Sequence, residues 1–198
     1  MNPVPLFLII VTLPLLLGGC GEKHEGVNAE AVEEREGIYY LVGSDTPYTG
    51  KSFALWKNGK KRDEGNYKDG KKHGLWIAWH ENGKKHVEVK IKDGKYDGLW
   101  TAWHENGKKA AKINYKDGKP EGLAFGWHEN GQKHVEVKAK DGKYDGLWTA
   151  WHENGKKGME ANYKEGRKVE GSEKFWNNKG EPVDSMQEAG LRRPTPAP

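Results

Sequence analysis

Glycines recur every 24 residues along most of this chain, and this period constrains the fold more than any other feature. Three glycine series keep the step, beginning at Gly50, Gly59 and Gly70. A fixed period of this length is typical of repeat proteins, in which each unit packs mainly against its neighbours. The glycines expected at turns in the second and third series are Gly59, Gly70, Gly83, Gly94, Gly107, Gly118, Gly131, Gly142, Gly155 and Gly166.

A second period of 48 residues overlies the first. Residues 80–109 and 128–157 are identical when aligned, except that Lys84 corresponds to Gln132 and Ile91 corresponds to Ala139. This near-identity indicates a duplicated unit. The motif "WHENG" therefore occurs four times, at 79–83, 103–107, 127–131 and 151–155, largely because it was copied. Agreement between the copies is weak support for a functional role. In the diverged first unit, Trp56 stands in the histidine position.

Each unit contains two strand-forming segments and two turn signals. "LWTAW" at 99–103 is a short apolar run of strand formers, and "HVEVKIK" at 86–92 alternates apolar and polar residues. Asn-Gly is a strong hairpin signal, and "KDGKYDG" returns the chain in the opposite direction. The fold class that follows is all-β, an elongated twisted antiparallel sheet of tandem 24-residue β-hairpins.

The register across each Asn-Gly turn has two alternatives. A two-residue turn would pair Trp79 with His86. A three-residue loop, with Gly83 as a bulge, would pair Ile77 with Val87 and Leu75 with Val89, which gathers the aliphatic side chains on one face. We favour the second alternative. A slip of one residue would exchange the two faces of the strand.

The N-terminal segment carries an export signal. The apolar run Val4–Leu17 closes with Leu17-Gly18-Gly19-Cys20, which resembles the lipobox of bacterial lipoproteins. The run is shorter than the about 20 residues of a membrane-spanning helix, and it is typical of a signal peptide. The resemblance implies cleavage before Cys20 and covalent lipid on its thiol. The alternative is an uncleaved or ordinarily cleaved signal peptide with a free thiol.

Four segments follow from these patterns. We expect a signal peptide at 1–19, a polar tether at 20–36, hairpin repeats at 37–180 and a flexible tail at 181–198. The lipoprotein resemblance implies a membrane-anchored, extracytoplasmic protein. Gly21 lacks the aspartate that retains lipoproteins in the inner membrane, so the outer membrane is favoured in a Gram-negative host.

The repeats also resemble a known family. The pattern "YTGK…WKNGKK…NYKDGKKHGLW…WHENGK", within residues 47–180, is similar to the MORN-repeat variant proteins of the YwqK type, which carry an antitoxin label. The resemblance implies β-hairpin repeats in an elongated sheet. The label implies a protein that binds and neutralises a toxin, although a shared fold does not by itself carry a function.

Histidine–glutamate pairs are the only catalytic-looking motif. The zinc-protease motif H-E-x-x-H needs a helix and a second histidine, but here Asn-Gly follows at once. Corresponding strands in a hairpin array lie about 10 Å apart, too far for two histidines to share a metal. We therefore expect no metal site, no catalytic residues and no enzyme activity. The histidines concerned are His80, His104, His128 and His152.

Tryptophans form two rows in opposite strand phases. One interpretation is packing over the sheet, another is a platform for glycan rings or quaternary ammonium groups, and a third is a protein-binding face. Ala124 interrupts the first row. The first row contains Trp76, Trp100 and Trp148, and the second contains Trp79, Trp103, Trp127 and Trp151.

The charge pattern narrows the class of partner. The chain has 33 basic and 29 acidic residues, a net charge of +4, and the two signs are interspersed. Nucleic-acid binding would need a one-signed patch, so it is not expected. The single cysteine excludes an intramolecular disulfide. We expect no cofactor beyond the lipid on Cys20.

The function expected from these features is a lipid-anchored cell-envelope scaffold. It binds a protein partner, with toxin neutralisation as the role that the family label implies. The alternative is an envelope polysaccharide- or lipid-binding module that uses the tryptophan rows. The sequence specifies neither the partner nor the oligomeric state.

Overall fold

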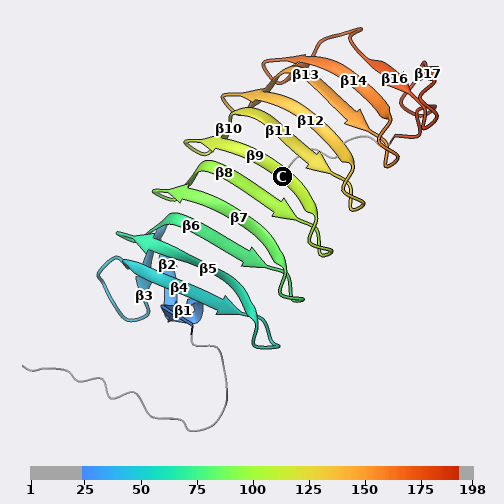
Figure 1. Cartoon of the computed structure of the whole chain (residues 1–198). Coiled ribbons are helices and arrows are strands. Elements are labelled where there is room, and N and C mark those ends of the chain that lie inside the picture. The colour runs from blue at the N-terminus through green and yellow to red at the C-terminus, as the bar shows by residue number, and fades with distance from the viewer. Residues whose placement is uncertain (1–23, 192–198) are drawn as a thin grey trace, which may run out of the picture.

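A computed structural model describes residues 24–191, and this part of the chain is almost entirely β-structure (Figure 1). One sheet of 15 strands runs the length of the molecule, with a separate two-stranded hairpin near its beginning. The strands follow one another in chain order, and every pairing is antiparallel except that of the first strand. The expected fold class is confirmed. The expected signal peptide and Cys20 lie outside the described residues.

The long sheet is a continuous series of hairpins. Its strands are β1 (Val27–Asn28), β4 (Gly50–Leu55), β5 (Lys61–Lys68), β6 (Lys71–Trp79), β7 (Lys85–Lys92), β8 (Lys95–Trp103), β9 (Lys109–Lys116), β10 (Lys119–Pro120), β11 (Gly122–Trp127), β12 (Lys133–Lys140), β13 (Lys143–Trp151), β14 (Lys157–Lys164), β15 (Arg167–Lys168), β16 (Lys174–Trp176) and β17 (Pro182–Val183).

The two turn types have different geometries. Lys92 pairs with Lys95 across Asp93 and Gly94, whose φ angles of 50° and 81° are those of a two-residue type I′ turn. The Asn-Gly turns are longer, because the Gly83 N–H donates to the His80 carbonyl at 2.8 Å. All ten glycines expected at turns have φ between 71° and 90°, which costs glycine least.

The favoured register was wrong in the body of the strands. The three-residue loop with Gly83 as a bulge is present, but Ile77 pairs with Glu88 and Ala78 pairs with Val87. A second bulge beside Trp79 shifts the pairing by one residue. Trp79 consequently pairs with Lys85 and not with His86, although the body of the two strands keeps the register of the two-residue alternative.

This register defines the two faces of the sheet. We name them by the N-terminal and C-terminal caps described below, both of which pack on the same face. The capped face carries Trp76, Ala78, Val87, Val89, Ile91 and their equivalents, and the open face carries Leu75, Ile77, Trp79, Lys85, Glu88, Lys90 and their equivalents. Apolar residues therefore lie on both faces.

The N-terminal cap is the hairpin of β2 (Val32–Arg35) and β3 (Ile38–Leu41), which follows the short helix η1 (Ala29–Ala31). The Tyr39 ring lies 4.8 Å from the Tyr67 ring of the capped face. Structure thus begins inside the segment expected as a tether, because the strand-forming residues 38–41 find a partner in residues 32–35.

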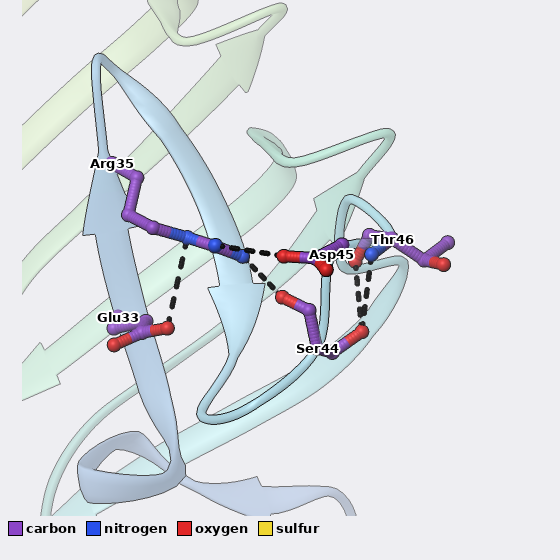
Figure 2. Close-up of polar contacts among 5 residues, drawn as sticks. All are labelled: Glu33, Arg35, Ser44, Asp45 and Thr46. Atoms are coloured by element: carbon purple, nitrogen blue, oxygen red, sulfur yellow. Dashed lines mark hydrogen bonds and ion pairs between the residues drawn. The ribbon is translucent and has the colours of Figure 1, made fainter.

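Arg35 fastens this cap to the loop that follows it (Figure 2). Its guanidinium donates to Asp45 at 3.1 Å and to the Ser44 carbonyl, and it lies 3.6 Å from Glu33. The same group lies 3.9 Å from the centre of the Tyr40 ring. These contacts hold the loop between β3 and β4 in place.

The C-terminal cap lies within the segment expected as a flexible tail. Ala189 is only 2% exposed, and Met186 and Leu191 pack against the buried cluster of the capped face. That cluster consists of Ala150, Met159 and Ala161. The tail expectation missed these apolar residues because they lie in a short, mostly polar segment.

Between the caps, no second layer covers the sheet within residues 24–191, yet its aliphatic residues are buried. Val89 and Val137 are both 4% exposed. Trp100 stands between its cross-strand partners Val89 and Ile113, so its ring supplies the cover. Tryptophan here replaces the second layer of an ordinary sandwich.

Candidate functional site

Each histidine of the repeated motif bonds the next repeat. The Nε2–H of His80 donates to the Trp103 carbonyl at 2.9 Å, and His104 donates in the same way to the Trp127 carbonyl at 2.9 Å. His128 and His152 repeat the contact at 2.8 Å. These bonds engage one of the two ring nitrogens of each histidine in a contact between repeats.

In the first repeat, Trp56 occupies the position that histidine occupies in the later repeats, and it makes the same bond. Its indole N–H donates to the Trp79 carbonyl at 3.1 Å, which is the bond that histidine makes in later repeats. The shared property is a ring N–H donor. The exchange of histidine for tryptophan in the first unit was therefore a sequence signal for this structural role.

The asparagine of the motif and the lysine that follows the motif add two more bonds between loops. Asn82 Nδ2 donates to the Glu105 carbonyl at 2.9 Å, while its Oδ1 accepts the Lys84 N–H at 2.9 Å. Lys84 Nζ donates to the Asn106 carbonyl at 2.9 Å. We call this series of bonds between successive Asn-Gly loops the loop ladder. The motif thus stacks the repeats.

Two additional histidines lie against the ladder. The rings of His80 and His86 are 4.3 Å apart, and those of His128 and His134 are 4.4 Å apart. Burial, and secondarily the neighbouring ring, lowers the pKa of both His86 and His134. Within residues 24–191, no group of three or more histidine, cysteine, aspartate or glutamate side chains could hold a metal.

The tryptophans of the capped face line hollows beside the caps. A hollow of about 740 Å³ near the N-terminal cap is lined by Trp76, Tyr39, Glu34 and others. Burial, followed by a hydrogen bond with Glu34, raises the pKa of Tyr39 to about 12. The Lys72 ammonium lies 4.6 Å from the Trp76 ring, so the protein itself supplies a cation to this ring.

A second hollow of about 730 Å³ lies beside the C-terminal cap. Trp148, Met159, Met186 and Leu191 are among its lining residues, and they come from the sheet and the cap together. Trp100 lies between the two hollows in the row. The capped-face row therefore lines a hollow at each end of the array, and Trp100 lies between Val89 and Ile113 in the middle.

Three of the four predicted tryptophans of the open face have a lysine over the ring, whereas Trp127 stacks with Phe125 at 5.9 Å. Lys61 Nζ lies 5.2 Å from the Trp79 ring centre, Lys85 lies 5.2 Å from Trp103, and Lys133 lies 4.9 Å from Trp151. The same lysines form ion pairs with glutamates, as Lys85 does with Glu88 at 2.6 Å. Cation–π positions on these rings are thus filled from within the chain.

A leucine row on the open face was missed by the sequence analysis. It consists of Leu75, Leu99, Leu123 and Leu147, which are 48%, 45%, 51% and 49% exposed. They pair across the strands with polar residues, namely Lys90, Asn114, Lys138 and Asn162. The 24-residue step was the signal that could have revealed the row.

The fold and these surfaces define a tandem β-hairpin repeat scaffold. Three segments match the family model described as MORN repeat variant, at residues 72–93, 96–117 and 144–165. Each match covers one hairpin closed by an Asn-Gly loop, as the sequence resemblance predicted. No curated protein matches the chain. Within residues 24–191, no helix is long and apolar enough to cross a membrane.

Proposed function

We propose that this protein is a membrane-tethered, extracytoplasmic scaffold that binds a protein partner along the open face of its sheet. The leucine row carries the proposal. Its four side chains are about half exposed, and they extend over about 29 Å if strands lie about 4.8 Å apart. A row of half-exposed apolar side chains on one face is apolar surface of the kind that interaction sites commonly use.

The open face suits a protein better than a polysaccharide. Sugar rings stack on free aromatic faces, but lysines already lie over Trp79, Trp103 and Trp151. Exposed aliphatic side chains offer burial and no hydrogen bonds for hydroxyl groups. Toxin neutralisation, as the family resemblance implies, is the particular form of protein binding that we propose to test first.

A lipid on Cys20 would hold the first strands close to a bilayer. The described chain starts at His24, whose ring lies 4.9 Å from the Phe53 ring of β4. Four residues span at most about 14 Å. Acylation of Cys20 would therefore leave little slack between the membrane surface and the sheet.

The anchor is tested by replacing its thiol. We expect Cys20→Ser to lose incorporation of labelled palmitate and to be released from membrane fractions, because two or more acyl chains are needed for stable anchoring. Wild-type protein that incorporates no label would refute the lipid anchor. Partner binding, tested separately with soluble protein, does not depend on this result.

Partner binding is tested on the leucine row. Crosslinking in envelope extracts should recover one defined protein with wild type and lose it with the double variant Leu99→Ser and Leu123→Ser. Val42→Ser, at an exposed residue outside the row, is the matched control. Recovery that excess glycan abolishes, or that the leucine variant leaves unchanged, would refute binding of a protein by this face.

A further inference from the structure

One strand breaks the charge pattern of the open face. In four of the strands that follow an Asn-Gly loop, the first lysine forms an ion pair with a glutamate three residues later. The pairs are Lys61–Glu64 at 2.8 Å, Lys85–Glu88 at 2.6 Å, Lys133–Glu136 at 2.7 Å and Lys157–Glu160 at 2.7 Å. In β9, Lys109 is followed by Lys112 instead.

No carboxylate compensates Lys112 from the adjacent strands. Its cross-strand partners are Thr101 in β8 and Phe125 in β11. The next glutamates across the sheet, Glu88 and Glu136, stand one strand further away on each side, about 10 Å from Lys112. Both are engaged by their own lysines.

Two more lysines extend this positive region into the leucine row. Lys90 and Lys138 stand in that row as cross-strand partners of Leu75 and Leu123. Within residues 24–191, neither they nor Lys109 and Lys112 of β9 form an ion pair. We call these four residues, Lys90, Lys109, Lys112 and Lys138, the central basic patch.

We infer that the central basic patch binds an acidic segment of the protein partner. Carboxylates of that segment lie at Lys109 and Lys112, and its apolar side chains cover Leu99 and Leu123. The inference rests on the proposed function and adds the partner's chemistry. Complementary charge steers such an encounter, whereas a second copy of this chain would bring like charges together on its own open face.

The spacing of the leucines also specifies the segment's conformation. Successive leucines are two strands apart, or about 9.6 Å. A polyproline-II segment presents the same side every three residues, or about 9.3 Å, and stays within about 1 Å of register over three steps. An α-helix presents it every seven residues, or about 10.5 Å, and drifts by about 3 Å. An extended acidic segment with every third residue apolar fits the row.

A labelled peptide of about four Pro-Leu-Glu triplets, spanning about 37 Å, is the probe. Fluorescence anisotropy should show binding to wild type that weakens with added salt. Lys112→Glu restores the ion-pair pattern of the other four strands, so the variant should fold, which its urea midpoint will check. We expect it to weaken peptide binding about tenfold or more.

Two controls isolate the patch. Lys57→Glu makes the same change of charge in the first Asn-Gly loop, and it should bind the peptide like wild type. A peptide of Pro-Leu-Lys triplets should not bind. Equal binding by wild type and Lys112→Glu, or equal binding of the two peptides, would overturn the inference.

The remaining outcomes separate this inference from the proposed function. If the envelope protein is captured by Lys112→Glu but not by the variant of Leu99 and Leu123, the proposed function stands and the acidic partner is wrong. Vesicles of equal parts phosphatidylcholine and phosphatidylglycerol provide the other comparison. Lys112-dependent binding to these vesicles, with no binding of the acidic peptide, would assign the patch to a bilayer and overturn the inference.

Discussion

The hydrogen bond from His104 to the Trp127 carbonyl should contribute measurably to stability. The bond is 2.9 Å long and partly buried. A bond of this kind contributes about 0.5–1.5 kcal/mol net. His104→Phe keeps an aromatic ring and removes the donor, so we expect the free energy of unfolding to fall by about 1 kcal/mol. The melting temperature should fall by about 2–4 °C.

The contrasting variant is His104→Trp. Trp56 already makes the corresponding bond at 3.1 Å, so an indole at position 104 should restore part of the stability that phenylalanine loses. Urea unfolding followed by far-UV circular dichroism suits the comparison, because the added tryptophan would disturb fluorescence. The slope as well as the midpoint must be compared, since neighbouring repeats can unfold separately.

A control within the same motif tests the interpretation. Glu105→Gln changes the carboxylate next to His104 and leaves the ladder bonds intact, so its midpoint should match wild type. A His104→Phe protein as stable as wild type would show that the bond contributes nothing. A His104→Trp protein less stable than His104→Phe would refute the equivalence of the two ring donors.

Two further predictions concern packing and pH. Gly65→Ala would place a Cβ about 2.1 Å from the Trp76 ring, so it should destabilise the protein by about 1–3 kcal/mol in urea and alter the near-UV spectrum; an unchanged midpoint would contradict the close packing. The lowered pKa values of His86 and His134 mean that the unfolded chain binds protons first as pH falls below about 6.5, so stability should decrease there. The double variant His86→Ala and His134→Ala should lose less free energy of unfolding than wild type between pH 7.5 and 5. Parallel plots of unfolding free energy against pH for the two proteins would refute this.

The glycine period was sufficient to predict the hairpins and their order. It could not specify the register, because apolar residues occur in both phases of each strand. Leu75 and Ile77 looked like the partners of the valines, but Trp76 and Ala78 face them. The cause is the bulge beside Trp79, whose pairing depends on backbone geometry and not on hydrophobic pattern.

The role of the histidines could not be predicted from the sequence of a single repeat, because their bonds join one repeat to the next. Each ladder bond joins a side chain to a backbone carbonyl 22 to 24 residues away, and every residue has such a carbonyl, so the acceptor cannot be recognised in the sequence. The leucine row was missed for a different reason. Leucine is scarce in the repeats, so its period is less apparent than that of tryptophan, although Leu99 and Leu123 keep the same 24-residue step.

The bonds of the loop ladder all run in one direction along the chain, and this direction affects how the repeat array can become longer. Every donor points toward the following repeat, but the last loop ends the series, because Asn177 donates to Glu181 within its own loop. New units can therefore enter the middle of the array without altering either end. A duplication of 48 residues inserts two complete hairpins and lengthens the rod by about 19 Å. Unequal duplication would set how far the scaffold extends.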